Sequence, residues 1–209
     1  MSRSPILWDV DTQIDFVHPG NKLVVPGAAA AIPAMARLIS WARENAIVHV
    51  ASADDHELTD PEISVEPDFT STYPPHCLRG TRGAQRIPET EQIEPIVFSD
   101  VAYPPLVVGE LIAGRHEILL LKKSFDVFTN PNAEAVLEVL DPSEVIVFGV
   151  ATDVCDHAAI IGMLRRGRRV AFVEDAAQGL EAERTRACFA QWRAAGVRFT
   201  TSDEVAAAG

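Results

Sequence analysis

The sequence lacks long apolar runs, a cysteine-rich framework and an excess of basic residues. No apolar stretch approaches the roughly 20 residues that a membrane span needs. Three cysteines, Cys77, Cys155 and Cys188, are too few and odd in number for a disulfide framework, which favours a reducing compartment. With 18 lysines and arginines against 30 aspartates and glutamates, the net charge is −12. This acidic balance disfavours nucleic acid or an anionic membrane as a partner.

Several catalytic and targeting signatures are also missing. The sequence has no Gly-x-Ser-x-Gly elbow, no P-loop and no Gly-x-Gly-x-x-Gly fingerprint, which disfavours serine hydrolases and nucleotide-binding proteins. Residues 1–5 lead directly into a strand-like segment and lack a signal-peptide pattern, so we expect a cytoplasmic protein.

What the sequence does contain is a regular alternation of two kinds of segment. The predicted strands are 6–10, 47–51, 117–121, 145–150, 169–173 and 197–200, and the predicted helices are 27–45, 133–140, 153–166 and 182–195. Continuously apolar strands separated by helices are typical of βαβ units. We therefore predict an α/β fold, a three-layer α/β/α domain with a mainly parallel sheet.

The length suits a single domain over residues 1–209. Residues 54–105 are the exception to the alternation, since they are rich in proline, aspartate, glutamate and threonine and show little periodicity. A connection of this length inside a compact domain is usually functional. We therefore predict that it is a long active-site loop.

Polar residues follow four of the predicted strands. They are Asp9 and Asp11, then Asp54, Asp55 and His56, then Lys122 and Lys123, and finally Thr152, Asp153 and Cys155. Ligands of open parallel sheets bind beyond the carboxyl ends of the strands. The pattern therefore places carboxylates, a histidine, an ammonium group and a thiol at one edge of the sheet.

Cys155 lies where a buried strand is predicted to turn into a helix. There a thiol meets the positive end of the helix dipole and unpaired N–H groups, which favour a thiolate and can hold an oxyanion. The alternative is a small buried hydrophobic residue. Asp11 is equally compatible with a turn or capping role, and Lys122 with a side chain that extends to solvent.

Asp54, His56 and His76 form a ligand set of two histidines and one carboxylate. Such a set suits zinc, iron or manganese and leaves positions open for a substrate. Cys77, beside His76, is a second possible ligand or a core residue. The alternative is that all of these are solvated loop residues.

Three segments resemble the isochorismatase-like cysteine hydrolases, a family that includes the nicotinamidases. Residues 11–16, DTQIDF, resemble the Asp-x-Gln-x-Asp-Phe opening of the family. Residues 122–128 are similar to its Lys-x-x-Tyr-Ser-x-Phe segment, with phenylalanine and aspartate in place of tyrosine and serine. Residues 149–155 match its Gly-x-Ala-Thr-Asp-x-Cys nucleophile turn without a mismatch. The resemblance covers nearly the whole chain.

Membership would imply the fold of that family and a catalytic triad of Asp11, Lys122 and Cys155. It would also imply a non-proline cis peptide between Val150 and Ala151. In this scheme Lys122 stabilises the thiolate, Asp11 transfers the proton, and the N–H groups of Ala151 and Cys155 hold the oxyanion.

Two further segments resemble the nicotinamidases in particular. Residues 54–56 look like their Asp-Trp-His, with Asp55 in place of tryptophan, and residues 73–84 look like their Trp-Pro-x-His-Cys-x-x-Gly-Thr-x-Gly-Ala. The resemblance implies a divalent metal, with zinc preferred over iron or manganese, held by Asp54, His56 and His76. It also implies that the aromatic rings of Phe16, Tyr73 and Phe128 contact the substrate.

The resemblance has one departure near the metal ligands. The His-x-Ser-Phe segment usual in the family is absent, and residues 63–69 occupy that region.

The first hypothesis is an enzyme that hydrolyses nicotinamide or a related heterocyclic carboxamide to the acid and ammonia. The second is a family hydrolase of another small amide or ureido compound without a catalytic metal. The third is a catalytically silent binding module. We expect a small-molecule amide as partner and, as is common in the family, a homo-oligomer.

Overall fold

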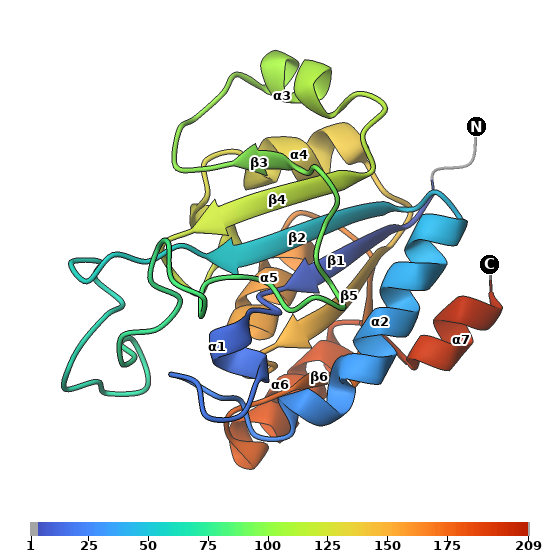
Figure 1. Ribbon diagram of the computed structural model, residues 1–209. Helices are drawn as coiled ribbons and strands as arrows, with labels where there is room; N and C mark the ends of the chain where they lie inside the picture. The colour runs from blue at the N-terminus through green and yellow to red at the C-terminus, as the bar shows by residue number, and fades with distance from the viewer. Residues whose placement is uncertain (1–3, 209) are drawn as a thin grey trace.

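The computed structural model describes residues 4–208, and a seven-stranded parallel sheet forms its centre (Figure 1). The strands are β1 (Ile6–Val10), β2 (Val48–Asp54), β3 (Ile96–Phe98), β4 (Glu117–Lys122), β5 (Val145–Val150), β6 (Val170–Gln178) and β7 (Arg198–Thr200). Their order is β3-β4-β2-β1-β5-β6-β7, and every pair is parallel. The prediction of a parallel α/β sheet is confirmed.

Helices cover both faces of this sheet. They are α1 (Ile14–Val17), α2 (Ala28–Glu44), α3 (Pro105–Ile112), α4 (Ala133–Leu140), α5 (Cys155–Arg165), α6 (Ala182–Ala194) and α7 (Ser202–Ala207), with a short 3-10 helix, η1 (Val127–Thr129). α2 and α7 pack on one face, and α4, α5 and α6 pack on the other. The three-layer prediction is therefore confirmed. Within residues 4–208, none of the helices has the length and apolar character needed to cross a membrane.

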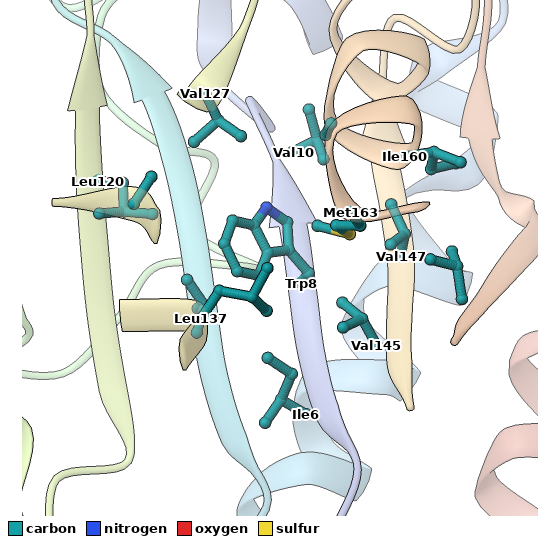
Figure 2. Packing of buried hydrophobic residues seen from close by; sticks show 14 of the residues in the cluster. Ile6, Trp8, Val10, Leu120, Val127, Leu137, Val145, Val147, Ile160 and Met163 are labelled. Atoms are coloured by element: carbon teal, nitrogen blue, oxygen red, sulfur yellow. The ribbon is translucent and has the colours of Figure 1, made fainter. Parts of the chain in front are cut away.

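The core is divided in two by the sheet because successive side chains of a strand point to opposite faces. In β1, Leu7 packs with α2, whereas Ile6, Trp8 and Val10 point to the other face and pack with α4 and α5. Figure 2 shows Trp8 at the centre of this second cluster, between Leu137 of α4 and Met163 of α5. Burying a large apolar side chain stabilises a fold by about 1.5–3 kcal/mol. Packing on both faces therefore stabilises the strands whose carboxyl ends bear the polar residues.

Two parts of the prediction need correction. The segment 54–105 is not a continuous loop, because β3 lies within it and pairs with β4. This short strand lies in the proline- and acid-rich segment, outside the alternation of strands and helices by which the equally short β7 was predicted. The helix predicted from about residue 153 begins at Cys155, and the Asp153 carboxylate before it accepts hydrogen bonds from the N–H groups of Leu180 and Glu181, beyond β6.

Two backbone features shape the carboxyl edge of the sheet. Asp11 adopts a φ of 49°, which turns the chain away from the ladder directly after β1. Gly149 in β5 has a φ of 135°, and a Cβ atom there would come within 2.1 Å of the carbonyl oxygen of Val10. Only glycine permits this approach. The ends of β1 and β5, which lead to Asp11 and to the turn before Cys155, are thereby held side by side.

Candidate active site and metal centre

Lys122, at the end of β4, lies between the other two residues of the predicted triad. Its Nζ atom lies 2.8 Å from Oδ2 of Asp11 and 4.0 Å from Sγ of Cys155. Asp11 is further held by Ser52, whose hydroxyl donates to Oδ1 at 2.7 Å. All three predicted residues are buried. The parallel sheet thus brings together a carboxylate, an ammonium group and a thiol from β1, β4 and the start of α5.

Burial controls the protonation of this cluster. It raises the pKa of the Cys155 thiol well above its usual range, and the opposing charge of Lys122 does not reverse the shift. Burial likewise raises the pKa of the Asp11 carboxyl against the effect of Lys122. For Lys122, burial alone would lower the pKa, but the charges of Asp11 and Asp54 raise it well above its usual range. Lys122 is therefore charged at neutral pH.

The direction for Cys155 corrects one sequence-based expectation. The start of a helix and a nearby ammonium group were expected to favour a thiolate, but burial among Asp11, Asp54 and Glu62 favours the neutral thiol. A group with a raised pKa needs a base to take its proton. Asp11, whose own pKa is raised, is a stronger base than an ordinary aspartate.

The turn from β5 into α5 has the backbone arrangement that the sequence resemblance implied. The peptide bond between Val150 and Ala151 is cis. The Ala151 carbonyl accepts the N–H groups of Val154 and Asp156, which closes the turn around Cys155. Cys155 is the first residue of α5, so its sulfur lies at the positive end of the helix dipole.

A second group of polar side chains lies beside the triad. Asp54, His56, Glu62 and His76 are all buried, and one potential ligand atom from each lies within 4.8 Å of the other three. Oδ2 of Asp54 is 3.6 Å from Nε2 of His56 and 3.5 Å from Nε2 of His76. The three residues predicted from sequence as metal ligands are therefore brought together.

These residues fit a divalent cation in three respects. Oδ2 of Asp54 and Nε2 of His56 are buried without a hydrogen-bond partner in the described part of the chain, which is costly unless a ligand binds them. Nδ1 of His76 is 2.7 Å from the Pro74 carbonyl, so that nitrogen carries the hydrogen and Nε2 keeps its lone pair. Two histidine nitrogens and two carboxylates are the donor set of zinc, iron or manganese.

Glu62 is the residue that sequence reasoning missed. It lies just before residues 63–69, where the usual family segment is absent. Oε1 of Glu62 is 3.9 Å from Nε2 of His56, while Oε2 accepts the N–H of Phe125 at 2.7 Å. A buried glutamate in a loop without periodicity gives no sequence signal. Only the folding of the loop against His56 brings Glu62 close to the other three side chains.

Asp54 belongs to both groups of side chains. Its Oδ1 atom accepts a hydrogen bond from Lys122, and its Oδ2 atom faces the two histidines. Burial alone would raise the pKa of Asp54, but the charge of Lys122 and the adjacent imidazoles of His56 and His76 hold it well below its usual range. One ionised carboxylate thus joins the triad to the candidate metal centre.

A small pocket opens beside Cys155. Phe16, Tyr73, His76 and Ala151 are among the residues that line it, and its free volume is about 20 Å³. That volume accommodates about one water molecule. The structure therefore brings two of the three predicted aromatic residues to the Cys155 pocket.

Phe128 lies elsewhere, which corrects its predicted place in the site. Within residues 4–208 it is not among those that line the Cys155 pocket. Its ring stacks on Trp8 at a centroid distance of 6.5 Å and lies under the Arg166 guanidinium. A Cβ atom on Gly162 would come within 2.2 Å of it. Phe128 packs against α5 and supports the core.

Cys77 also lies outside the group of potential ligands among the described residues. Its N–H donates to Oδ2 of Asp15 at 2.8 Å, and its thiol is buried near the Gly83 carbonyl. Burial raises its pKa well above the usual range. Of the two roles that the sequence left open for Cys77, the structure supports the core residue.

Comparison with known proteins gives one family. Residues 6–204 match the isochorismatase domain. The chain is 32% identical to the nicotinamidase/pyrazinamidase of Mycobacterium tuberculosis, over 92% of this chain and 96% of that protein.

Two solved structures have the same fold. The pyrazinamidase of Pyrococcus horikoshii, solved in complex with zinc, superposes with a TM-score of 0.75 at 22% identity over 95% of this chain and 99% of its own. The N-carbamoylsarcosine amidase of Thermoplasma acidophilum superposes with a TM-score of 0.74 at 22% identity, over 96% of this chain and 97% of its own.

Proposed function

This chain belongs to the isochorismatase family, and on that premise we propose that it is a nicotinamidase-like hydrolase that cleaves the C–N bond of a small carboxamide. The observation that carries the proposal is the position of Lys122. Its ammonium group contacts Asp11 and approaches the Cys155 sulfur, and it shares Asp54 with the candidate metal centre. Such a buried arrangement of opposite charges around a thiol suits covalent catalysis.

The substrate that we propose is nicotinamide, which would be converted to nicotinate. The Mycobacterium tuberculosis relative carries the name of that activity. The rings of Phe16 and Tyr73 line the pocket that contains Cys155, and aromatic faces stabilise a flat heterocycle between them.

In the first half of the proposed reaction, Asp11 accepts the proton of the Cys155 thiol while the sulfur attacks the amide carbonyl carbon. The C–S bond forms, and the carbonyl oxygen becomes an oxyanion held by the N–H groups of Ala151 and Cys155. Asp11 then gives its proton to the amide nitrogen, the C–N bond breaks, and ammonia leaves a thioester. Lys122 keeps the negative charge of Asp11 balanced in this buried site.

In the second half, Asp11 accepts a proton from water as the water oxygen attacks the thioester carbon. The tetrahedral intermediate collapses, the C–S bond breaks, and the proton on Asp11 returns to the sulfur. One amide and one water are consumed, and one acid and one ammonia are formed.

Asp54, His56, Glu62 and His76 are the residues that would hold a divalent cation, with zinc preferred over iron or manganese. When bound, the cation would offset the charge of the two carboxylates and offer a coordination position to a ring nitrogen. This group of ligands also weighs against the alternative of a metal-free hydrolase of linear amides or ureido compounds. In a metal-free enzyme, Oδ2 of Asp54 and Nε2 of His56 would remain buried without a hydrogen-bond partner in the described part of the chain, which is costly.

The test is an assay of ammonia release from nicotinamide, pyrazinamide and small linear amides. We expect nicotinamide or pyrazinamide to be preferred, and Cys155→Ala to reduce turnover by about 10⁴-fold or more because the nucleophile is lost. Cys188→Ala, which removes a buried thiol from α6, is the matched control and should retain activity. Unchanged turnover in Cys155→Ala would overturn the proposed cysteine chemistry. A preference for linear amides would overturn the proposed substrate.

A further inference from the structure

The Gln13 side chain makes an unusual set of contacts with the backbone of Asp54. The N–H of Asp54 donates to Oε1 of Gln13 at 2.7 Å, and Nε2 of Gln13 donates to the carbonyl of Asp54 at 2.8 Å. The same Nε2 donates to the carbonyl of Ala84 at 2.8 Å. Gln13 is fully buried. Its primary amide therefore uses both of its hydrogens and its oxygen on main-chain groups.

This contact continues the sheet beyond the point where β1 leaves it. The last register pair between β1 and β2 is Val10 with Ser52, after which Asp11 turns the chain away. Asp54, two residues further along β2, pairs with Lys122 of β4 on its other side. A side-chain amide has the same donor and acceptor groups as a peptide bond. Gln13 thus supplies the missing strand contact on the side of β1.

We propose that Gln13 is a positioning residue for Asp54, and that its amide fixes the carboxylate that the triad and the candidate metal centre share. The inference rests on the proposed function, since it assigns Asp54 to both groups. The Asp54 carboxylate reaches Lys122 with one oxygen and the two histidines with the other. Both contacts depend on where the backbone of residue 54 lies. A shift of that backbone would disturb the ligands before it disturbed the fold.

Gln92, which lies in the segment before β3, provides a matched control because its side chain contacts the other end of β2. Its Nε2 atom donates to the carbonyls of His49 and Ile118, both at 3.0 Å, which clamps β2 to β4 near their amino-terminal ends. Gln92 is also buried. The two glutamines therefore make comparable backbone contacts at opposite ends of β2, and only Gln13 reaches a proposed ligand.

The experiment compares Gln13→Met with Gln92→Met. Methionine retains the length of the side chain and removes its hydrogen-bonding groups, so both variants should lose thermal stability. We expect Gln13→Met to bind zinc about 10–100-fold more weakly than the wild type, measured by competition with a chromophoric chelator. Gln92→Met should keep the wild-type affinity. Gln13→Asn, which retains a neutral amide but shortens its reach, should also weaken zinc binding and serves if Gln13→Met does not fold.

Wild-type zinc affinity in both Gln13 variants, or equal weakening by Gln92→Met, would overturn the positioning role. If the wild type itself binds no zinc, the proposed metal centre fails, and crystal structures of the wild type and a Gln13 variant then decide the inference. A displaced Asp54 carboxylate would support it, and an unmoved one would overturn it.

Discussion

Asp9 and Asp11 lie two residues apart at the end of β1 and are both fully buried, yet their surroundings differ. Asp9 is paired with the Arg86 guanidinium, accepts the hydroxyl of Thr12 at 2.9 Å, and lies 3.4 Å from Nε2 of His49. Asp11 is paired instead with Lys122, which also approaches the Cys155 sulfur.

The two aspartates differ in the other contacts that their cationic partners make. Arg86 uses the same nitrogen on Asp9, on Thr12 and on the carbonyl of Thr90, so this cluster ties the segment around residues 86–90 to the sheet. Lys122 pairs with the carboxylates of Asp11 and Asp54 and also approaches the thiol of Cys155. A closed polar cluster of this kind stabilises structure, whereas one that includes a nucleophile can carry out chemistry.

The largest predicted effect separates these two roles. Asp11→Asn should lower kcat/KM for nicotinamide by about 10²–10⁴-fold, because it removes the proposed acid and base. Its cost in unfolding free energy should be small, because Lys122 keeps Asp54 as a second carboxylate partner.

Asp9→Asn should show the reverse pattern. It leaves the buried Arg86 without its carboxylate and should cost about 3–5 kcal/mol of unfolding free energy, measured by urea denaturation. The activity per folded molecule should change much less than in Asp11→Asn. If both variants lost stability and activity to the same degree, the distinction between the two clusters would be wrong.

An effect of intermediate size is expected at Glu62. Glu62→Gln keeps an oxygen to accept the N–H of Phe125 but removes the charge that faces His56. The zinc concentration needed for half-maximal activity after chelation should rise by at least about tenfold. Glu57→Gln, on the exposed side of the same loop and paired with Arg79, is the control and should behave as the wild type. Equal zinc requirements in the two variants would remove Glu62 from the ligand set.

The last prediction concerns the protonation of Cys155. Burial raises the pKa of its thiol, so below that pKa the group is the unreactive neutral form and above it the thiolate. In zinc-free protein the rate of alkylation by iodoacetamide, corrected with Cys155→Ala, should rise about tenfold per pH unit up to at least pH 9. A plateau with a midpoint below pH 7 would show a resting thiolate and would contradict the assignment of Asp11 as the group that must take the proton.

Sequence patterns predicted most of the sheet because its long strands are continuously apolar. β5, for example, was predicted with its observed bounds, since all six of its residues are buried. β3 was missed because it lies in the irregular segment 54–105, outside the alternation that predicted the equally short β7. Phe128 was misplaced because a motif gives no direction for a side chain. Its ring lies over Gly162 of α5, a contact between elements about thirty residues apart in sequence.

By itself the sequence determined which chemical groups stand at the carboxyl ends of β1, β2, β4 and β5, because the alternation of apolar strands and helices places each of these ends within three residues. It could not determine the protonation of Cys155, the position of Glu62 beside the candidate ligands, or the hydrogen bonds between Gln13 and Asp54. These depend on burial and on distances between segments that are remote along the chain. A shifted pKa, a set of converging candidate ligands and a side-chain contact with a remote backbone arise only when the folded chain brings these groups together and excludes water from around them.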